Sequence, residues 1–222
     1  MPFDKLRFTF DFDVIMTITK IEKQKKNKDR WNVFIDGAFA CGVNSDTLLK
    51  FQLKSGDEID ENKLKEIRDF DEYLYSKKIA FDFLSYRIRS EKELKDKLKG
   101  KDISHTSIER TIEHLKELKL INDEEFARQL ISEKLASKPV GKAVLRQKLI
   151  QKGISFKLSD EILKEYFSED NEKEFVISNF DKYFRRVEGL DRQQKRKKMF
   201  DYLARKGFDF DIIKQVINEK IE

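Results

Sequence analysis

Cysteine, histidine and proline are scarce in this sequence, and long apolar runs are missing. Its 222 residues include one cysteine, two histidines and two prolines. A single cysteine forms no internal disulfide, which is typical of proteins in a reducing compartment. No apolar run approaches the ~20 residues of a membrane-spanning helix, and the N-terminus has no apolar signal-peptide core. We therefore predict a cytoplasmic protein without a membrane span.

The residue sets that build common metal and nucleotide sites are incomplete. A zinc site needs several soft ligands, and Cys41, His105 and His114 are too few. We expect the Cys41 thiol to be buried as a small apolar group, and both histidines to lie on helix surfaces. The common glycine-rich phosphate loops do not occur. These absences argue against a cofactor or a metal.

One group of acids has the composition of a nuclease site. It consists of Asp82, Glu91 and Glu93 with Lys95. These residues fall on predicted helices among ordinary surface charges, so we interpret them as solvated. We therefore expect no catalytic residues and no small-molecule substrate.

A helix-and-turn pattern occurs three times in the chain. The copies span Leu94–Ser104, Leu145–Ser155 and Met199–Asp209. In each copy two apolar residues four positions apart mark one face of a helix. The second of each pair is a leucine, and these leucines, 51 and 54 residues apart, are Leu98, Leu149 and Leu203. We predict that they occupy equivalent buried positions in separate small cores.

The residue that follows each helix supports the same repeat. Four positions after each leucine come Asp102, Gly153 and Gly207. A helix commonly ends here in a left-handed residue, a conformation that glycine adopts freely and aspartate tolerates. We predict positive φ at both glycines, and a cost of ~1 kcal/mol or more when valine replaces either one. Arrays of such units usually bind extended partners.

Helical spacing of apolar residues extends each copy in both directions, so each repeat is predicted to contain three helices. Asn122 and Asp123 mark the start of the second repeat, with Asp123 as the helix N-cap. Ser90 and Glu93 are expected to form a capping box in the first repeat. We predict a mainly α fold, with a small β module at residues 1–59 and helical repeats at 60–122, 123–170 and 171–222.

The N-terminal module has short runs of β-branched and aromatic residues. Trp31–Ile35 and Phe39–Val43 are predicted strands joined at Asp36-Gly37, a strong hairpin signal. Ile15–Lys25 shows partial alternation and is predicted to complete a small antiparallel sheet. The first dozen residues are either an edge strand or a loose tail. We interpret the module as a cap on the repeat array, with partner docking as the alternative.

Positive charge is concentrated in three windows, although the net charge of the chain is only +5. Tyr86–Lys101 has seven basic and three acidic residues, Lys134–Lys152 six basic and no acidic, and Arg185–Lys198 seven basic and two acidic. Each window covers the middle helix of a repeat or the approach to it. Equivalent helices of stacked repeats tend to line up, so the windows predict a basic stripe for a polyanion or an acidic protein groove. The alternative is an ordinary solvated surface.

Eight basic side chains in or beside the middle helices are the candidate binding residues. They are Arg87, Arg89, Lys92, Lys95, Lys142, Arg146, Lys195 and Lys198. Their alternative role is structural, because an arginine beside a helix start can tie neighbouring helices together through their acids. Nothing in the sequence marks a base-reading helix or an aromatic stacking platform.

Several motifs resemble those of the RecX regulatory proteins. Leu84–Leu94 reads LSYRIRSEKEL and is similar to that family's L-x-x-R-x-R-S-x-x-E-L signature. Ile121–Ala127, Lys138–Gly141 and Leu149–Ile154 then follow the family pattern in order. The resemblance runs from about residue 70 to residue 222. The segment Ile18–Gly37 is similar to the N-terminal extension of family members from Gram-positive bacteria.

The resemblance implies three tandem three-helix domains in an elongated, curved molecule. It also implies a non-enzymatic modulator that lies in the groove of the RecA–single-stranded-DNA filament. Family members typically inhibit strand exchange, ATP hydrolysis and repressor cleavage by RecA. We expect a monomer whose partners are the RecA filament and single-stranded DNA, with double-stranded DNA left open. The alternative is a stand-alone, non-specific DNA-binding protein that acts through the basic stripe. The departures from the family pattern are modest: Asp102 replaces the usual glycine after the first middle helix, and the third repeat is the least regular.

Overall fold

The computed structural model describes residues 15–221, so the first dozen residues lie outside the part of the chain considered below. This part contains a four-stranded sheet and ten helices. It divides into two compact units. One extends to Asp82 and takes in Leu98–Thr111, and the other comprises Phe83–Lys97 and the chain from Ile112 onward. The mainly helical fold with a small N-terminal antiparallel sheet, predicted from the sequence, is confirmed.

The sheet has the strand order β3-β2-β1-β4 and is antiparallel throughout. Its strands are β1 (Met16–Lys23), β2 (Arg30–Ile35), β3 (Ala38–Asn44) and β4 (Glu58–Ile59). Asp36 and Gly37 form the predicted two-residue hairpin turn between β2 and β3, with φ of 52° and 82°. Positive φ at both positions is the geometry that matches the twist of the flanking strands.

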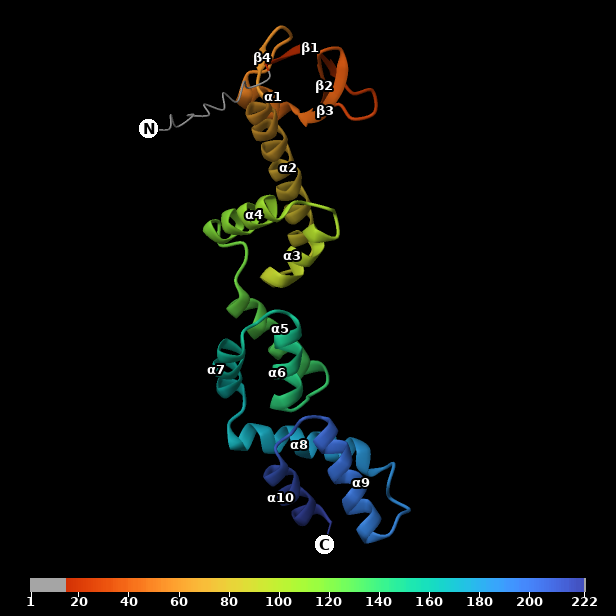
Figure 1. Ribbon diagram of the computed structural model, residues 1–222. Coiled ribbons are helices and arrows are strands. Elements are labelled where there is room, and N and C mark those ends of the chain that lie inside the picture. Colours follow the sequence, from red (N-terminus) through yellow and green to blue (C-terminus); the bar gives the residue numbers. More distant parts are fainter. Residues whose placement is uncertain (1–14, 222) are drawn as a thin grey trace, which may run out of the picture. The chain divides into compact units, whose positions relative to one another are not determined.

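The sheet packs on two helices, α1 (Ser45–Phe51) and the long α2 (Glu61–Leu84), which lie beside it in Figure 1. Ile18 and Val43 are fully buried in this core with Ile67 of α2. The buried carboxylate of Asp71 on α2 ties the layers together. It accepts hydrogen bonds from the Asn44 backbone at 2.5 Å and from Thr47 Oγ1 at 2.9 Å, and it pairs with Arg30 at 3.1 Å.

Together with α2, the remaining eight helices of the described chain form the three predicted three-helix domains. The first domain adds α3 (Glu91–Lys99) and α4 (His105–Glu117); the second has α5 (Asp123–Ser137), α6 (Lys142–Gln151) and α7 (Phe156–Tyr166); the third has α8 (Glu169–Phe184), α9 (Arg192–Arg205) and α10 (Phe210–Lys220). Leu98, Leu149 and Leu203 are fully buried, as predicted. Leu149 and Leu203 lie in separate hydrophobic cores.

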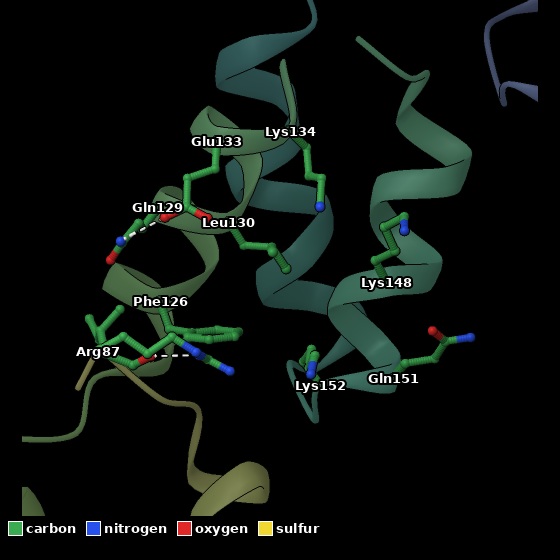
Figure 2. Close-up of a pocket in the computed structure, with 10 residues that line it drawn as sticks. Arg87, Phe126, Gln129, Leu130, Glu133, Lys134, Lys148, Gln151 and Lys152 are labelled. Atoms are coloured by element: carbon green, nitrogen blue, oxygen red, sulfur yellow. Dashed lines mark hydrogen bonds between the residues drawn. The ribbon is translucent and has the colours of Figure 1, made fainter. Parts of the chain in front are cut away.

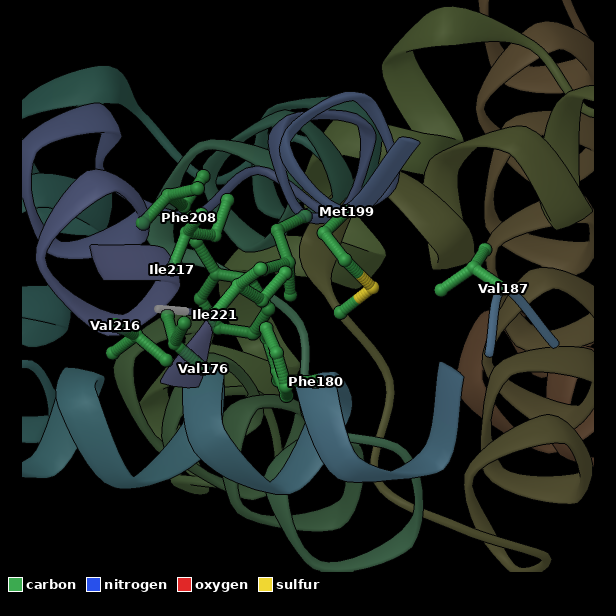
Figure 3. Close-up of a cluster of buried hydrophobic side chains, with 10 residues drawn as sticks. Val176, Phe180, Val187, Met199, Phe208, Val216, Ile217 and Ile221 are labelled. Carbon is green, nitrogen blue, oxygen red and sulfur yellow. The ribbon is translucent and has the colours of Figure 1, made fainter. Parts of the chain in front are cut away.

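The hydrophobic core of the third domain is formed by side chains from its own three helices and the residues that connect and follow them. Val176 and Phe180 point from α8 toward Ile217 and Ile221 at the end of the chain, and Met199 enters from α9 (Figure 3). All five side chains are at least nine-tenths buried. A three-helix unit thus encloses a core of its own.

The turn after each middle helix has the predicted conformation. Asp102 has φ of 56°, Gly153 of 90° and Gly207 of 83°. Backbone N–H groups up to three residues beyond the helix bond back to its carbonyls, as at Ile154, which donates to the Leu149 carbonyl at 3.0 Å. This is the left-handed helix ending expected from the sequence.

Two predicted caps are different in the structure. The N-cap of α5 is Asn122, whose side chain accepts from Glu124 and Glu125, so the prediction of Asp123 was wrong by one residue. The Asp123 carboxylate instead accepts the Glu91 N–H at 2.9 Å, which caps α3 from outside. Ser90 Oγ accepts the N–H of residue 93 at 3.2 Å, as in a capping box. The carboxylate of that residue turns away to two cations, as described below.

The middle helix of one repeat docks on the turn of the next. A Cβ atom at Gly153 would lie 2.5 Å from Lys92 Cβ, at the start of α3. At the following joint, Gly141 donates its N–H to the Lys206 carbonyl at 2.8 Å, and a Cβ there would lie 2.0 Å from the backbone of Gly207. Both glycines after the middle helices therefore serve a close approach as well as a left-handed turn.

Candidate functional site

A basic groove lies where the segment before α3 meets the second domain. We call this cavity of about 370 Å³ the first junction groove. Its apolar wall consists of Ile88, Phe126 and Leu130. Its charged residues are the cations Arg87, Lys134, Lys148 and Lys152 and one acid, Glu133; Gln129 and Gln151 complete the lining. Lys134 from α5 and Lys148 from α6 face the groove from its two sides (Figure 2).

Helical spacing explains why these side chains share one face. Phe126, Leu130 and Lys134 follow one another at intervals of four on α5. Lys148 and Lys152 have the same spacing at the end of α6. Residues four apart project from the same side of a helix. Phe126 is anchored in the core of the second domain, which fixes the orientation of the α5 face.

The carboxylate of Glu93 controls the charge at one end of this groove. It receives two hydrogen bonds from the Arg87 guanidinium, at 3.0 and 3.1 Å, and one from Lys152 Nζ at 2.6 Å. Burial alone would raise the pKa of Glu93, but the hydrogen bonds and positive charges of these two residues outweigh it and hold the pKa at about 2. One carboxylate thus compensates two of the four groove cations, while Lys134 and Lys148 form no ion pair with any described residue.

The other candidates on the first middle helix make individual contacts. Arg89 lies on the Phe83 ring, 3.9 Å from its centre, and burial, followed by the charge of Arg87, lowers the pKa of its guanidinium. Lys92 Nζ donates to the Gln151 carbonyl at 3.0 Å. Lys95 forms an ion pair with Glu91 on the same helix at 2.9 Å.

Lys142 and Arg146 share one acid on α7. Arg146 lies 2.6 Å from the Asp160 carboxylate, and Lys142 lies 3.6 Å from it. The Arg146 guanidinium also lies 5.2 Å from the Phe156 ring centre. This geometry matches the helix-tying role that was the alternative for these cations.

The last two candidates lie on α9 and have no carboxylate partner among the described residues. Lys195 Nζ is 5.9 Å from the Phe184 ring centre, and Lys198 is exposed. Of the eight predicted side chains, Arg87 lines the first junction groove, and Lys142 and Arg146 line another cavity. The binding role of the eight remains a prediction.

Sequence reasoning did not select Lys134, Lys148 or Lys152 as binding residues, although all three lie in the second charged window. For Lys134 the signal is its spacing of four from Leu130 on the α5 face that begins at Phe126. For Lys148 and Lys152 it is their spacing of four from each other at the end of α6. Counting charges identifies the window. The spacing of residues along each helix then indicates which of its cations face the groove.

Two of the three nuclease-like acids, Glu91 and Glu93, are engaged in ion pairs. Glu91 contacts Lys95 and Lys116, the latter at 2.6 Å. Within residues 15–221, no group of three or more His, Cys, Asp or Glu side chains is arranged to hold a metal ion. No helix in that range is long and apolar enough to cross a membrane. Cys41 is half-buried, and burial raises the pKa of its thiol, which favours the unreactive protonated form.

Family models match the chain in four consecutive segments. The model of the regulatory protein RecX N-terminal domain matches residues 16–60. The models of the first, second and third three-helix domains of RecX match residues 77–115, 122–163 and 180–217. The chain belongs to the RecX family of regulatory proteins. The resemblance identified from the sequence motifs is therefore confirmed, including the N-terminal module.

Named RecX proteins from several bacteria are similar over nearly the whole chain. Regulatory protein RecX of Clostridioides difficile (strain 630) is 37% identical over 202 residues, which cover 91% of this chain and 94% of that protein. RecX of Bacillus subtilis (strain 168) is also 37% identical, with coverage of 91% and 76%. These relatives assign the chain a regulatory role.

Two solved structures of the family have the same fold. One crystal structure of a regulatory protein RecX superposes with a TM-score of 0.73 at 29% identity, covering 92% of this chain and 100% of that one. The crystal structure of RecX from Lactobacillus salivarius superposes with a TM-score of 0.63 at 30% identity, covering 67% and 96%.

Proposed function

We propose that this chain is a non-enzymatic regulator of the RecA recombinase. It binds the RecA–single-stranded-DNA filament in its groove and inhibits strand exchange, ATP hydrolysis and repressor cleavage. It acts as a monomer in the cytoplasm, and RecA and DNA are its partners. Membership of the RecX family supports this role.

The observation that carries the proposal is the meeting of two charged windows at the first junction groove. Arg87 comes from the first window, whereas Lys134, Lys148 and Lys152 come from the second. A tandem array with cations at its joints presents positive charge at intervals along the chain. This suits a polymeric anion such as a nucleoprotein filament.

The eight predicted side chains divide into two groups under this proposal. Lys195, Lys198, Lys92 and Arg89 form no ion pair with another described residue. Lys195 and Lys198 are available to contact the filament, whereas Lys92 and Arg89 would first leave the Gln151 carbonyl and the Phe83 ring. Arg87, Lys95, Lys142 and Arg146 are bound to carboxylates, and they contribute to binding only where these pairs exchange for phosphate.

A second candidate function is direct, non-specific DNA binding without RecA. The unpaired Lys134 and Lys148 favour it, because a cation without a carboxylate partner is free to neutralise a phosphate. Such binding weakens steeply with salt, with a log–log slope of about −0.9 per phosphate on duplex DNA and about −0.7 on single strands.

A salt titration of labelled protein separates the two functions. Binding is measured on DNA alone, and on DNA with RecA and a non-hydrolysable nucleotide. Binding of a regulator to the filament requires assembled RecA, remains measurable at moderate salt and lowers the RecA ATPase rate, even where the chain also binds bare DNA more weakly. Equal affinity for bare DNA and filament, with no effect on the ATPase, contradicts the proposal and supports the second function.

The test protein for this assay is the double variant Lys134→Glu/Lys148→Glu. The control is the double variant Lys157→Glu/Arg205→Glu. Both pairs change the charge equally, but Lys157 and Arg205 are exposed and lie outside the groove. Only the groove pair is expected to weaken binding.

A further inference from the structure

A second groove lies at the joint between the second and third domains, and none of the eight predicted residues lines it. We call this cavity of about 500 Å³ the second junction groove. Its lining comes from the linker after α5, from α8 and from the end of α9. Four cations line it without any acid: Lys138, Lys182, Arg186 and Lys206. None of the four forms an ion pair with another described residue.

The two junction grooves are built from equivalent positions of the repeat. Arg87 lies seven residues before Leu94, and Lys138 lies seven residues before the equivalent Leu145. Lys152 and Lys206 lie seven residues after Leu145 and Met199, respectively. The cations at the two ends of each groove therefore correspond to each other.

The carboxylate of the first groove has no counterpart in the second. Glu93 directly precedes Leu94, and the residue that directly precedes Leu145 is Val144. In the first groove this carboxylate holds Arg87 and Lys152. In the second groove the same two positions remain uncompensated, so its positive charge is available to an external anion.

The wall of the second groove carries a pair of stacked aromatic rings. Tyr183 of α8 and Tyr202 of α9 lie with their ring centres 4.0 Å apart and their planes within 5°. Lys206 Nζ lies 5.7 Å from the Tyr202 ring centre. The buried Asn179 side chain of α8 fixes the linker beside the groove, since its amide donates to the Pro139 carbonyl at 3.1 Å. Flat half-buried rings beside free cations are the elements that single-stranded nucleic-acid sites combine.

We propose that the second junction groove binds single-stranded nucleic acid. The phosphates contact Lys138, Lys182, Arg186 and Lys206, and an unpaired base packs against the tyrosine pair. This deepens the proposed function, because it names the site at which the chain meets the strand.

The tyrosine pair favours single-stranded nucleic acid over other polyanions as the ligand of this groove. Bases in a duplex are stacked inside the helix and do not offer a free face to a protein ring, whereas an unpaired base does. An acidic peptide would use the cations but would gain nothing from the flat rings. The site therefore reads neither base sequence nor duplex shape.

The test measures the fluorescence anisotropy of a short labelled oligo-dT with the purified chain, without RecA. The variant Lys182→Glu/Arg186→Glu changes two exposed groove residues, and Lys157→Glu/Arg205→Glu is the matched control. Loss of two phosphate contacts makes the log–log salt slope shallower by about 1.4. We expect affinity to fall at least tenfold for the groove variant and to change little for the control.

A second arm tests the ring contact. Tyr183→Leu removes a flat surface, whereas Tyr183→Phe retains it. We expect roughly tenfold weaker oligo-dT binding for the leucine variant and near-normal binding for phenylalanine, the range that one stacked base contributes. Melting curves of both variants show whether the fold is kept. Duplex of the same length is expected to bind more weakly and to be insensitive to Tyr183→Leu.

Equal losses in the groove and control variants would overturn the proposal, as would tyrosine variants that bind like the wild type. The filament assay keeps this outcome apart from the proposed function. Suppose that oligo-dT binding is unaffected in Lys182→Glu/Arg186→Glu while filament binding and ATPase inhibition persist. The proposed single-strand site is then refuted, and the proposed regulation of RecA is retained. If oligo-dT binding depends on the groove but the chain neither binds the RecA filament nor inhibits its ATPase, the single-strand site is retained and the proposed regulation of RecA is refuted.

Discussion

Glutamine in place of Glu93 removes the charge that joins α3 to the end of α6. The side chain is only 13% exposed, and its carboxylate binds Arg87 and Lys152 together. Lowering its pKa from 4.5 to about 2 corresponds to about 3.4 kcal/mol between the two protonation states. Both partner side chains are more than 40% exposed, so solvent screening reduces this value. We expect Glu93→Gln to destabilise the protein by about 1–2 kcal/mol at neutral pH.

The assay is thermal melting of wild type and Glu93→Gln over a range of pH. For a chain of this size, each kcal/mol corresponds to roughly 2–4 °C in melting temperature. The pKa in the folded state lies below the unfolded value of 4.5, so the stabilisation is complete above that pH. It is lost as the pH falls toward 2. The difference between the two proteins should therefore narrow steadily below pH 4.5.

The matched control is Glu165→Gln, which breaks a pair with Arg128 at a more exposed site. We expect a smaller change in melting temperature there, because water screens the pair. A Glu93→Gln protein that melts like the wild type at neutral pH would refute the reasoning. A difference of the same size at every pH would also refute it, since the effect would then be steric rather than electrostatic.

Two further substitutions test the joints of the fold. Gly141→Ala should lower the melting temperature by several degrees, because its Cβ would lie 2.0 Å from the Gly207 backbone and overpacking typically costs about 1–3 kcal/mol. The control Gly189→Ala places its Cβ in open space and should melt like the wild type. Asp71→Ala should destabilise the N-terminal unit by roughly 2–4 kcal/mol, because Asp71 is buried and bonded to β3, α1 and Arg30. Urea denaturation should show little effect for the exposed neighbour variant Asp69→Ala.

Features with a local cause were predicted correctly from the sequence. The hairpin at Asp36-Gly37 depends on the φ of two adjacent residues, and both have the required sign. Leu149 and Leu203 are buried because each repeats an apolar position four residues earlier, which sets a helix face. Turn and helix patterns of this kind are complete within about a dozen residues of the chain.

Features that depend on distant partners were not predicted. Glu93 was expected to complete a cap with Ser90, but its carboxylate binds Lys152, 59 residues away. The basic windows counted charge without its compensation, so Arg146 appeared as free as Lys138. In the structure Arg146 is held by an acid on α7, whereas Lys138 has no ion pair within residues 15–221. Only the fold determines which cations meet a carboxylate.

The turn after the middle helix of the first repeat shows why Asp102 stands where the family usually has glycine. Gly153 and Gly207 each meet two demands, a positive φ and the close approach of a middle helix from the preceding repeat. Within residues 15–221 no middle helix of a repeat precedes the first repeat, so the turn at Asp102 requires only the left-handed conformation, with φ of 56°. Aspartate tolerates that conformation, and the Asp102 side chain is exposed. The departure at this position therefore follows from its place at the start of the array.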